Sequence, residues 1–220
     1  QMRALSASQV DALSEVQLGA LTATQTAGLT QEALNTFSAA DIAALNAKAV
    51  SGLSSQNIAA LSQEQIGALS SAQVAALTTD QVVALRADQV TALSVDQVRA
   101  LSAAQVGVLP ATTLAALSTD RIAALSAAAV SGLTNVQMGA LSREQMGSFS
   151  ASQIGAMTSA QMMAVSADKF SVLSPANIAA ITPKALSGLS GNRIGSFSGE
   201  QIAALTTSQM AALTADQIAT

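Results

Sequence analysis

The chain has 220 residues, of which 50% are apolar and 10% are charged, and its formal net charge is −4. It contains no His, Cys, Trp or Tyr, so it lacks the residue types that most often act as general base, metal ligand or thiol nucleophile. We therefore predict that it is not an enzyme, and we expect no catalytic, cofactor-binding or metal-binding residues and no small-molecule substrate. Polar residues interrupt every apolar run well below the roughly 18 to 20 residues that span a bilayer, so we also expect no membrane insertion.

A large apolar residue recurs at every eighth position from Leu5 to Leu213, in 27 octads without an insertion. The consensus is Leu-Ser/Thr-x-x-Gln-Ile/Val-x-Ala, with Leu5 at position one, Ser6 at position two, Gln9 at position five and Val10 at position six. Such self-similarity is typical of a solenoid whose repeats bury their apolar faces only against neighbouring repeats. We interpret residues 1–220 as a single continuous repeat domain, and we expect it to be a segment of a larger protein.

Each octad carries the signals of a helix N-terminus. Ser or Thr at position two and Gln at position five have the spacing of a capping box, and positions one and six have that of a hydrophobic staple. Ten of the 13 acidic residues occupy position four, where a carboxylate faces the positive end of the helix dipole. Pro175 follows Ser174 and Pro183 follows Thr182, so both prolines fall at the first helical position. The pattern predicts one helix of roughly six residues in each octad, ended by the next cap.

Two other architectures fit the repeat less well. In one continuous helix the apolar stripe would drift by about 80° per octad and cover every face. A β-solenoid favours alternating β-branched or aromatic strands, whereas Ala and Gln abound here. We therefore predict an all-α solenoid of short capped helices with about three octads per superhelical turn, because four would enclose a void. The expected cross-section is a triangular prism with a Leu/Ile/Val core.

Three departures from the consensus are considered individually, and we interpret them as tolerated defects in a redundant structure. Thr26 is polar at position six, Arg86 replaces the cap, and Pro110 stands where a cap is expected.

Two patterns of charged residues invite a functional interpretation that the chemistry disfavours. Five acids lie at multiples of 24 along the chain, but turns about 9 Å apart would hold them too far apart to share a calcium ion. We interpret them as acids that cap helix dipoles: Asp96, Asp120, Glu144, Asp168 and Asp216. A Ser-Lys dyad with Lys48, Lys169 or Lys184 is disfavoured because caps and solvated surface already account for these residues.

The octad from Leu61 to Ala68, Leu-Ser-Gln-Glu-Gln-Ile-Gly-Ala, resembles that of bacterial octapeptide-repeat proteins. The likeness covers essentially the whole chain. It implies a triangular coil of very short α-helices and an origin in large, often surface-associated bacterial proteins, but it carries no established activity. The segment Leu77–Leu85 is also similar to the opening helix of the DNA-reading repeats of TAL effectors. Those repeats carry a base-reading loop that is missing here, and the net charge of −4 opposes phosphate binding, so we expect no nucleic-acid partner.

These observations favour a structural role, a rigid spacer or stalk, in a large bacterial surface or secreted protein. The alternative is a repetitive binding surface in which regularly spaced Ser, Thr and Gln recognise a protein, a glycan or ice. Neither end carries the polar capping repeat that solenoids usually need, so we also expect end-to-end self-association.

Overall fold

The structure of the chain is a computed structural model that describes residues 5–219. Within these residues it contains 27 short helices and no strand. The helices are α1 (Ala7–Asp11), α2 (Glu15–Gly19), α3 (Ala23–Thr26), α4 (Gln31–Leu34), α5 (Ala39–Ala44), α6 (Ala47–Gly52), α7 (Ser55–Ala60), α8 (Gln63–Gly67), α9 (Ser71–Ala76), α10 (Thr79–Val83), α11 (Ala87–Ala92), α12 (Val95–Arg99), α13 (Ala103–Gly107), α14 (Ala111–Ala115), α15 (Thr119–Ala124), α16 (Ala127–Ser131), α17 (Asn135–Ala140), α18 (Arg143–Gly147), α19 (Ala151–Gly155), α20 (Ser159–Ala164), α21 (Ala167–Phe170), α22 (Pro175–Ala180), α23 (Pro183–Ser187), α24 (Gly191–Ile194), α25 (Gly199–Ala203), α26 (Thr207–Ala212) and α27 (Ala215–Ile218).

Each helix ends because the chain becomes extended at the start of the next octad. Leu77 has φ −58° and ψ 135°, and Thr78 has φ −72° and ψ 159°, so these two residues separate α9 from α10. Pro175 and Pro183 are the first residues of α22 and α23. A backbone N–H at this position would have no intrahelical acceptor, so its absence in proline costs no hydrogen bond. No residue in the described part of the chain has a positive φ, so the corners need no left-handed backbone.

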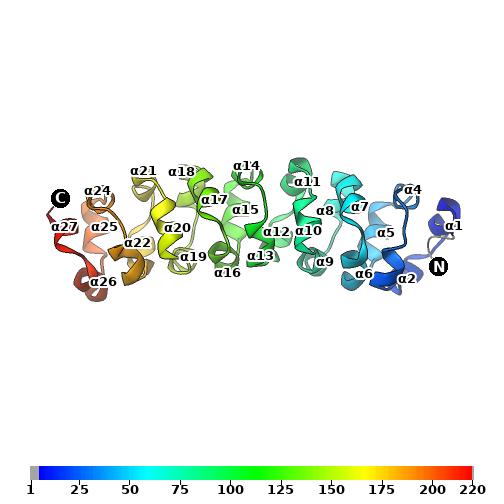
Figure 1. Cartoon of the computed structure of the whole chain (residues 1–220), viewed down its shortest axis with the longest axis horizontal. Coiled ribbons are helices and arrows are strands. Elements are labelled where there is room, and N and C mark those ends of the chain that lie inside the picture. The colour runs from blue at the N-terminus through cyan, green and yellow to red at the C-terminus, as the bar shows by residue number, and fades with distance from the viewer. Residues whose placement is uncertain (1–4, 220) are drawn as a thin grey trace. The chain divides into compact units, whose positions relative to one another are not determined.

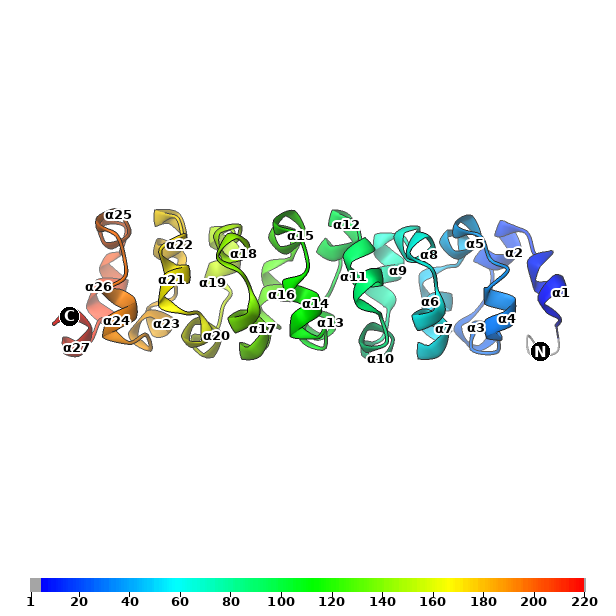
Figure 2. The same ribbon diagram turned by 90° about the horizontal axis from the view of Figure 1, so that it is seen from above.

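The chain divides into two compact units, Gln1–Leu101 and Ser102–Thr220. In the first unit each helix packs on the helix three places further along, which gives the columns α1-α4-α7-α10, α2-α5-α8-α11 and α3-α6-α9-α12 (Figure 1). The second unit repeats this rule, with columns that begin at α13, α14 and α15 (Figure 2). Three helices therefore make one turn of each unit, and the prediction of an all-α solenoid of short helices with three octads per turn is confirmed.

The core of each unit consists of the large apolar residues at positions one and six. Position one is buried in every octad from Leu21 to Phe197, and position six is buried in every octad from Val10 to Ile194. Burying a side chain of this size contributes about 1.5 to 3 kcal/mol. The repeat of eight residues thus supplies two core side chains per helix.

Candidate functional site

Hydrogen bonds between side chain and backbone define the start of most helices. At α9 the Ser70 hydroxyl accepts the N–H of Gln73 at 3.2 Å, and Gln73 Oε1 accepts the N–H of Ser70 at 2.6 Å. These two bonds satisfy two of the four amides that a helix N-terminus leaves without an intrahelical acceptor. Position two and position five are therefore fixed against each other in each such octad.

The amide nitrogen of the same glutamine makes a second set of bonds, to the preceding turn. Gln73 Nε2 donates to the carbonyl of Leu45 at 2.6 Å and to that of Ile42 at 2.9 Å, which lie 28 and 31 residues earlier. Ile42 belongs to α5 and Leu45 is its C-cap, so both carbonyls lie at a helix end, where intrahelical donors run out. One side chain thus serves the N-terminus of its own helix and the C-terminus of an earlier one.

This arrangement repeats along both units, and we name it the glutamine ladder. Its members are position-five glutamines whose Nε2 donates to a carbonyl 28 residues earlier, and they include Gln65, Gln73, Gln81, Gln89 and Gln97 in the first unit, and Gln137, Gln145, Gln153, Gln161, Gln201, Gln209 and Gln217 in the second. Most of these side chains are buried, and Gln73 and Gln81 are each only 2% exposed. No buried side-chain nitrogen or oxygen in the described part of the chain lacks a partner.

Other side chains replace the ladder bond in octads that lack glutamine. Asn57 donates to Leu29 at 3.2 Å and Asn177 to Phe149 at 2.7 Å, in each case to the carbonyl 28 residues earlier. Arg193 Nε makes the equivalent bond to Val165 at 3.0 Å. Any donor long enough to reach the preceding turn therefore fills this place.

Two unusual caps take part in the same contact with the preceding turn. Asn46 occupies the cap of an octad whose position five is Ala49, and its Nδ2 donates to the carbonyl of Leu21 at 2.6 Å. The Arg86 guanidinium donates to the carbonyl of Ala59 and forms an ion pair with Asp88 at 3.1 Å. Arg86, interpreted above as a tolerated defect, therefore adds bonds between turns. Pro110 makes no side-chain cap bond, as its chemistry requires.

Thr26 belongs to a close contact between α3 and α6. Its hydroxyl is fully buried and donates to the carbonyl of Ala49 at 2.6 Å. A Cβ on Gly52 would overlap the backbone carbonyl of Ala23, so this contact requires glycine there. Thr26, interpreted above as a tolerated defect, therefore adds a buried bond between two turns, and Gly52 lets the two backbones approach closely.

The acids at position four lie on the surface, and hydrogen bonds stabilise the charged form of several of them. The Arg86 guanidinium, followed by Gln63, lowers the pKa of Asp88. A bond from its own backbone N–H, followed by one from Ser142, lowers the pKa of Glu144. This agrees with carboxylates that face helix N-termini. Within residues 5–219 no group of three or more acids lies close enough to hold a metal ion.

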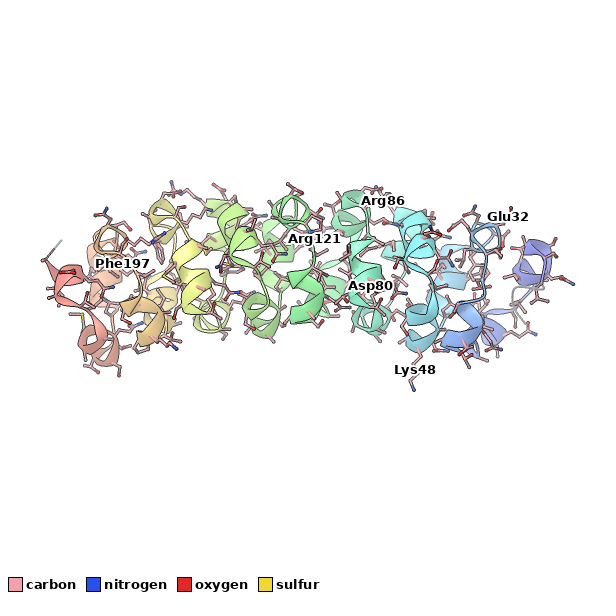
Figure 3. All side chains as sticks on the ribbon, in the orientation of Figure 1. Glu32, Lys48, Asp80, Arg86, Arg121 and Phe197 are labelled. Carbon is pink, nitrogen blue, oxygen red and sulfur yellow. The ribbon has the colours of Figure 1, made fainter. Side chains whose placement is uncertain are left out.

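Within the described residues, the side-chain amines of the lysines considered for a dyad donate no hydrogen bond to a serine hydroxyl. Lys48 and Lys184 are exposed, and Lys48 projects away from the ribbon in Figure 3. Lys169 Nζ donates to the carbonyl of Gly139 at 2.7 Å. In the described part of the chain no helix is both long and apolar enough to cross a membrane.

The stacked short helices and the ladder between them define a repeat protein of the α-solenoid class. A family model described as the ALTTAQ repeat matches residues 34–71 and 65–95, so this part of the chain is similar to that family. The comparison with curated proteins found no match.

Proposed function

We propose that the chain is a non-enzymatic spacer or stalk that holds other parts of a larger protein at a fixed separation, with a triangular cross-section in each unit. The observation that supports this role is the glutamine ladder. Consecutive members Gln73, Gln81 and Gln89 lie on α9, α10 and α11, which belong to three different columns. Bending a unit toward any side therefore separates consecutive turns on another side and breaks the glutamine bonds between them. Each buried polar group left unsatisfied costs about 1 to 3 kcal/mol.

We also propose, from the resemblance to bacterial octapeptide-repeat proteins, that the parent is a large surface or secreted protein. A regular binding face made of the position-two hydroxyls has less support. In most octads these hydroxyls already accept the N–H of position five, as Ser70 and Thr78 do at 3.2 Å.

A deletion within one unit tests the spacer role. The chain has no Cys, so cysteines introduced at the exposed Asp120 and Asp216 are the only sites for spin labels. These residues lie on α15 and α27, in the column α15-α18-α21-α24-α27. Deleting Gln137–Ala160 removes a length of three octads and keeps the register of the repeat, and we expect the label separation to shorten by one turn, about 8 to 10 Å, with a narrow distribution.

The control deletion, Gln137–Ala156, removes a length that is not a multiple of eight. It places Met157 where position five belongs, so we expect loss of helical signal and a broad distance distribution. A rigid spacer is refuted if the undeleted chain itself gives a broad distribution, or if both deletions give the same result.

A further inference from the structure

The side chain at position five stands between two helices that are stacked in the same column. Gln161 on α20 donates to the carbonyl of Leu133 at 2.7 Å, and Leu133 begins the octad that contains α17. Positions five and eight lie three residues apart, so they share the face of the helix that points to the preceding turn. On this face, the carbonyl of Ala164 lies 3.8 Å from the Cβ that a side chain would add to Gly139 on α17. The glutamine is therefore placed where it can hold the two backbones apart.

Glycines at position seven show how far apart the stacked helices lie. A Cβ added at such a glycine points to position eight of the helix in the next turn, as at Gly139. The distance to the nearest atom there depends on the residue at position five of that next helix. No described atom lies within 4 Å at Gly67 and the distance is 3.8 Å at Gly139, where that residue is Gln; it is 3.6 Å at Gly147 for Lys, 3.2 Å at Gly155 for Asn, 3.1 Å at Gly19 for Asp and 2.8 Å at Gly107 for Ala. The helices thus lie closer together as the side chain shortens from Gln through Asn and Asp to Ala.

Hydrogen bonding explains why the length of this side chain sets the separation. The amide of Gln161 is held on both sides, since its Oε1 accepts the N–H of Thr158 at 2.8 Å and its Nε2 donates to the preceding turn. The Asn side chain is shorter by one C–C bond, about 1.5 Å. Asn177 still reaches the carbonyl of Phe149 at 2.7 Å, so α22 lies closer to α19. Ala129 has no group to place between the turns, and α16 approaches α13 until their backbones are in contact.

A large side chain at position seven can take over this role. Ala185 is the position-five residue of α23, yet the nearest atom of the preceding turn to a Cβ on Gly188 is the sulfur of Met163, at 4.0 Å. Met163 stands at position seven of the octad that contains α20, and it fills the space that a glutamine fills elsewhere. On α6 position five is also alanine, but position seven of the octad below it is the small Ala27, and a Cβ on Gly52 would overlap the preceding turn.

In the second unit the short side chains lie in one column. Two of the four helices that follow α13 in its column carry one, Ala129 on α16 and Asn177 on α22. We call α13-α16-α19-α22-α25 the short column and α15-α18-α21-α24-α27 the long column. Every helix after the first in the long column carries a long position-five side chain: Gln145, Lys169, Arg193 and Gln217. Successive turns therefore lie closer together along the short column than along the long column.

We propose that position five sets the separation of stacked helices, and that Ala129 and Asn177 thereby bend the second unit toward the short column. A solenoid acquires its curvature from a small rotation of each repeat, and turns that lie closer together on one side are rotated toward that side. Gln at position five of all three columns keeps successive turns parallel, and a shorter residue in one column tilts them. This proposal is independent of the spacer role, because the bend exists whether or not the chain separates other domains.

Two matched pairs of spin labels measure this bend. The first pair is placed on the short column by Ala104→Cys on α13 and Glu200→Cys on α25. The second pair is placed on the long column by Asp120→Cys on α15 and Asp216→Cys on α27. All four are exposed position-four residues, and each pair spans four turns, so a straight unit would give the two pairs equal mean separations. We expect the first pair to be closer by about 2 Å.

The decisive variant restores glutamine in the short column. Ala129→Gln with Asn177→Gln places the consensus residue between α13 and α16 and between α19 and α22. We expect the first pair of labels to separate by about 2 Å more and the second pair to stay within about 0.5 Å of its value. Circular dichroism checks that the helical content is kept. If the double variant loses helix, Asn177→Gln alone replaces it, with an expected increase of about 0.5 to 1 Å.

A matched control makes the same two exchanges at residues that face solvent. Ala128→Gln and Asn192→Gln are both at exposed position-four residues, on α16 and α24, and should change neither separation. The proposal is overturned if the two pairs have equal mean separations in the labelled parent, if the glutamines at position five leave the first pair unchanged, or if the control lengthens the first pair as much. Broad distributions for both pairs would contradict the rigid spacer, whereas the bend is decided by the difference between the two means.

Discussion

Replacing Gln81 by Glu separates the two roles of a ladder side chain. The new carboxylate can still accept the N–H of Thr78, which Gln81 Oε1 accepts at 2.8 Å. It cannot donate to the carbonyls of Val50 and Leu53, which Gln81 Nε2 reaches at 2.9 and 2.7 Å. The loss of two hydrogen bonds lowers the free energy of unfolding by about 1 to 3 kcal/mol. Repulsion between the buried carboxylate and the two carbonyl oxygens lowers it further, so we expect a total loss of about 3 to 5 kcal/mol at pH 7.

The effect of Gln81→Glu should depend on pH in a defined direction. Burial against carbonyl oxygens raises the pKa of the introduced carboxyl above its unfolded value of about 4.3. The deficit in stability is therefore largest above the raised pKa and shrinks as the pH falls toward the unfolded value, because the protonated acid regains one donor. Urea unfolding at a series of pH values, followed by circular dichroism, measures this.

Gln17→Glu is the matched control for this prediction. Gln17 has the same position in its octad and accepts the N–H of Ser14 at 2.8 Å, but it is exposed and its Nε2 reaches no earlier turn. We expect a change within about 0.5 kcal/mol. Equal losses at the two positions would show that the glutamines act only as caps, and the reasoning about the ladder would be wrong.

Four further predictions concern packing and pH. Leu77→Ala should cost about 2 to 5 kcal/mol in urea unfolding, because Leu77 is only 5% exposed. Gly52→Ala should lower the melting temperature, since its Cβ would overlap a backbone carbonyl. A Cβ at Gly67 meets no atom within 4 Å, so Gly67→Ala should raise the free energy of unfolding by about 0.5 to 1 kcal/mol. Changes of the same sign in the two variants would contradict this. The lowered pKa values of Asp88 and Glu144 give stability that is present above their ordinary values of 3.8 and 4.5 and is lost as the pH falls through the lower folded values. Because the chain has no His, melting temperatures should be nearly constant between about pH 5 and 8.

The local and global folds were predictable because every octad repeats the same signals. Ser and Thr at position two mark where each helix begins, and the prolines at 175 and 183 agree with them. The number of octads per turn followed from the size of the core side chains, and the stacking of α3, α6 and α9 confirms it. Periodicity alone could not show that the contacts divide the chain after Leu101, because the repeat continues there without interruption.

The ladder was missed because a capping box already accounted for the glutamine. A capping box accepts Glu as well as Gln, yet position five holds Gln in 16 octads and Glu in none. Only an amide offers both an acceptor and a donor, so this bias was the available signal for a second partner. The partner itself, a carbonyl 28 residues earlier, depends on how the turns stack, which a single octad does not encode.

The one-way reach of the ladder also bears on how such a chain folds during synthesis. Gln73 bonds to residues 28 and 31 places before it, and never to residues that follow. A nascent octad that leaves the ribosome therefore meets acceptors that are already in place, and it waits for nothing downstream to form these bonds. When each new turn is added to a solenoid that is already folded, only the last turn exposes its apolar side chains at any stage of synthesis. This limits the aggregation to which long proteins are prone while they are being synthesised.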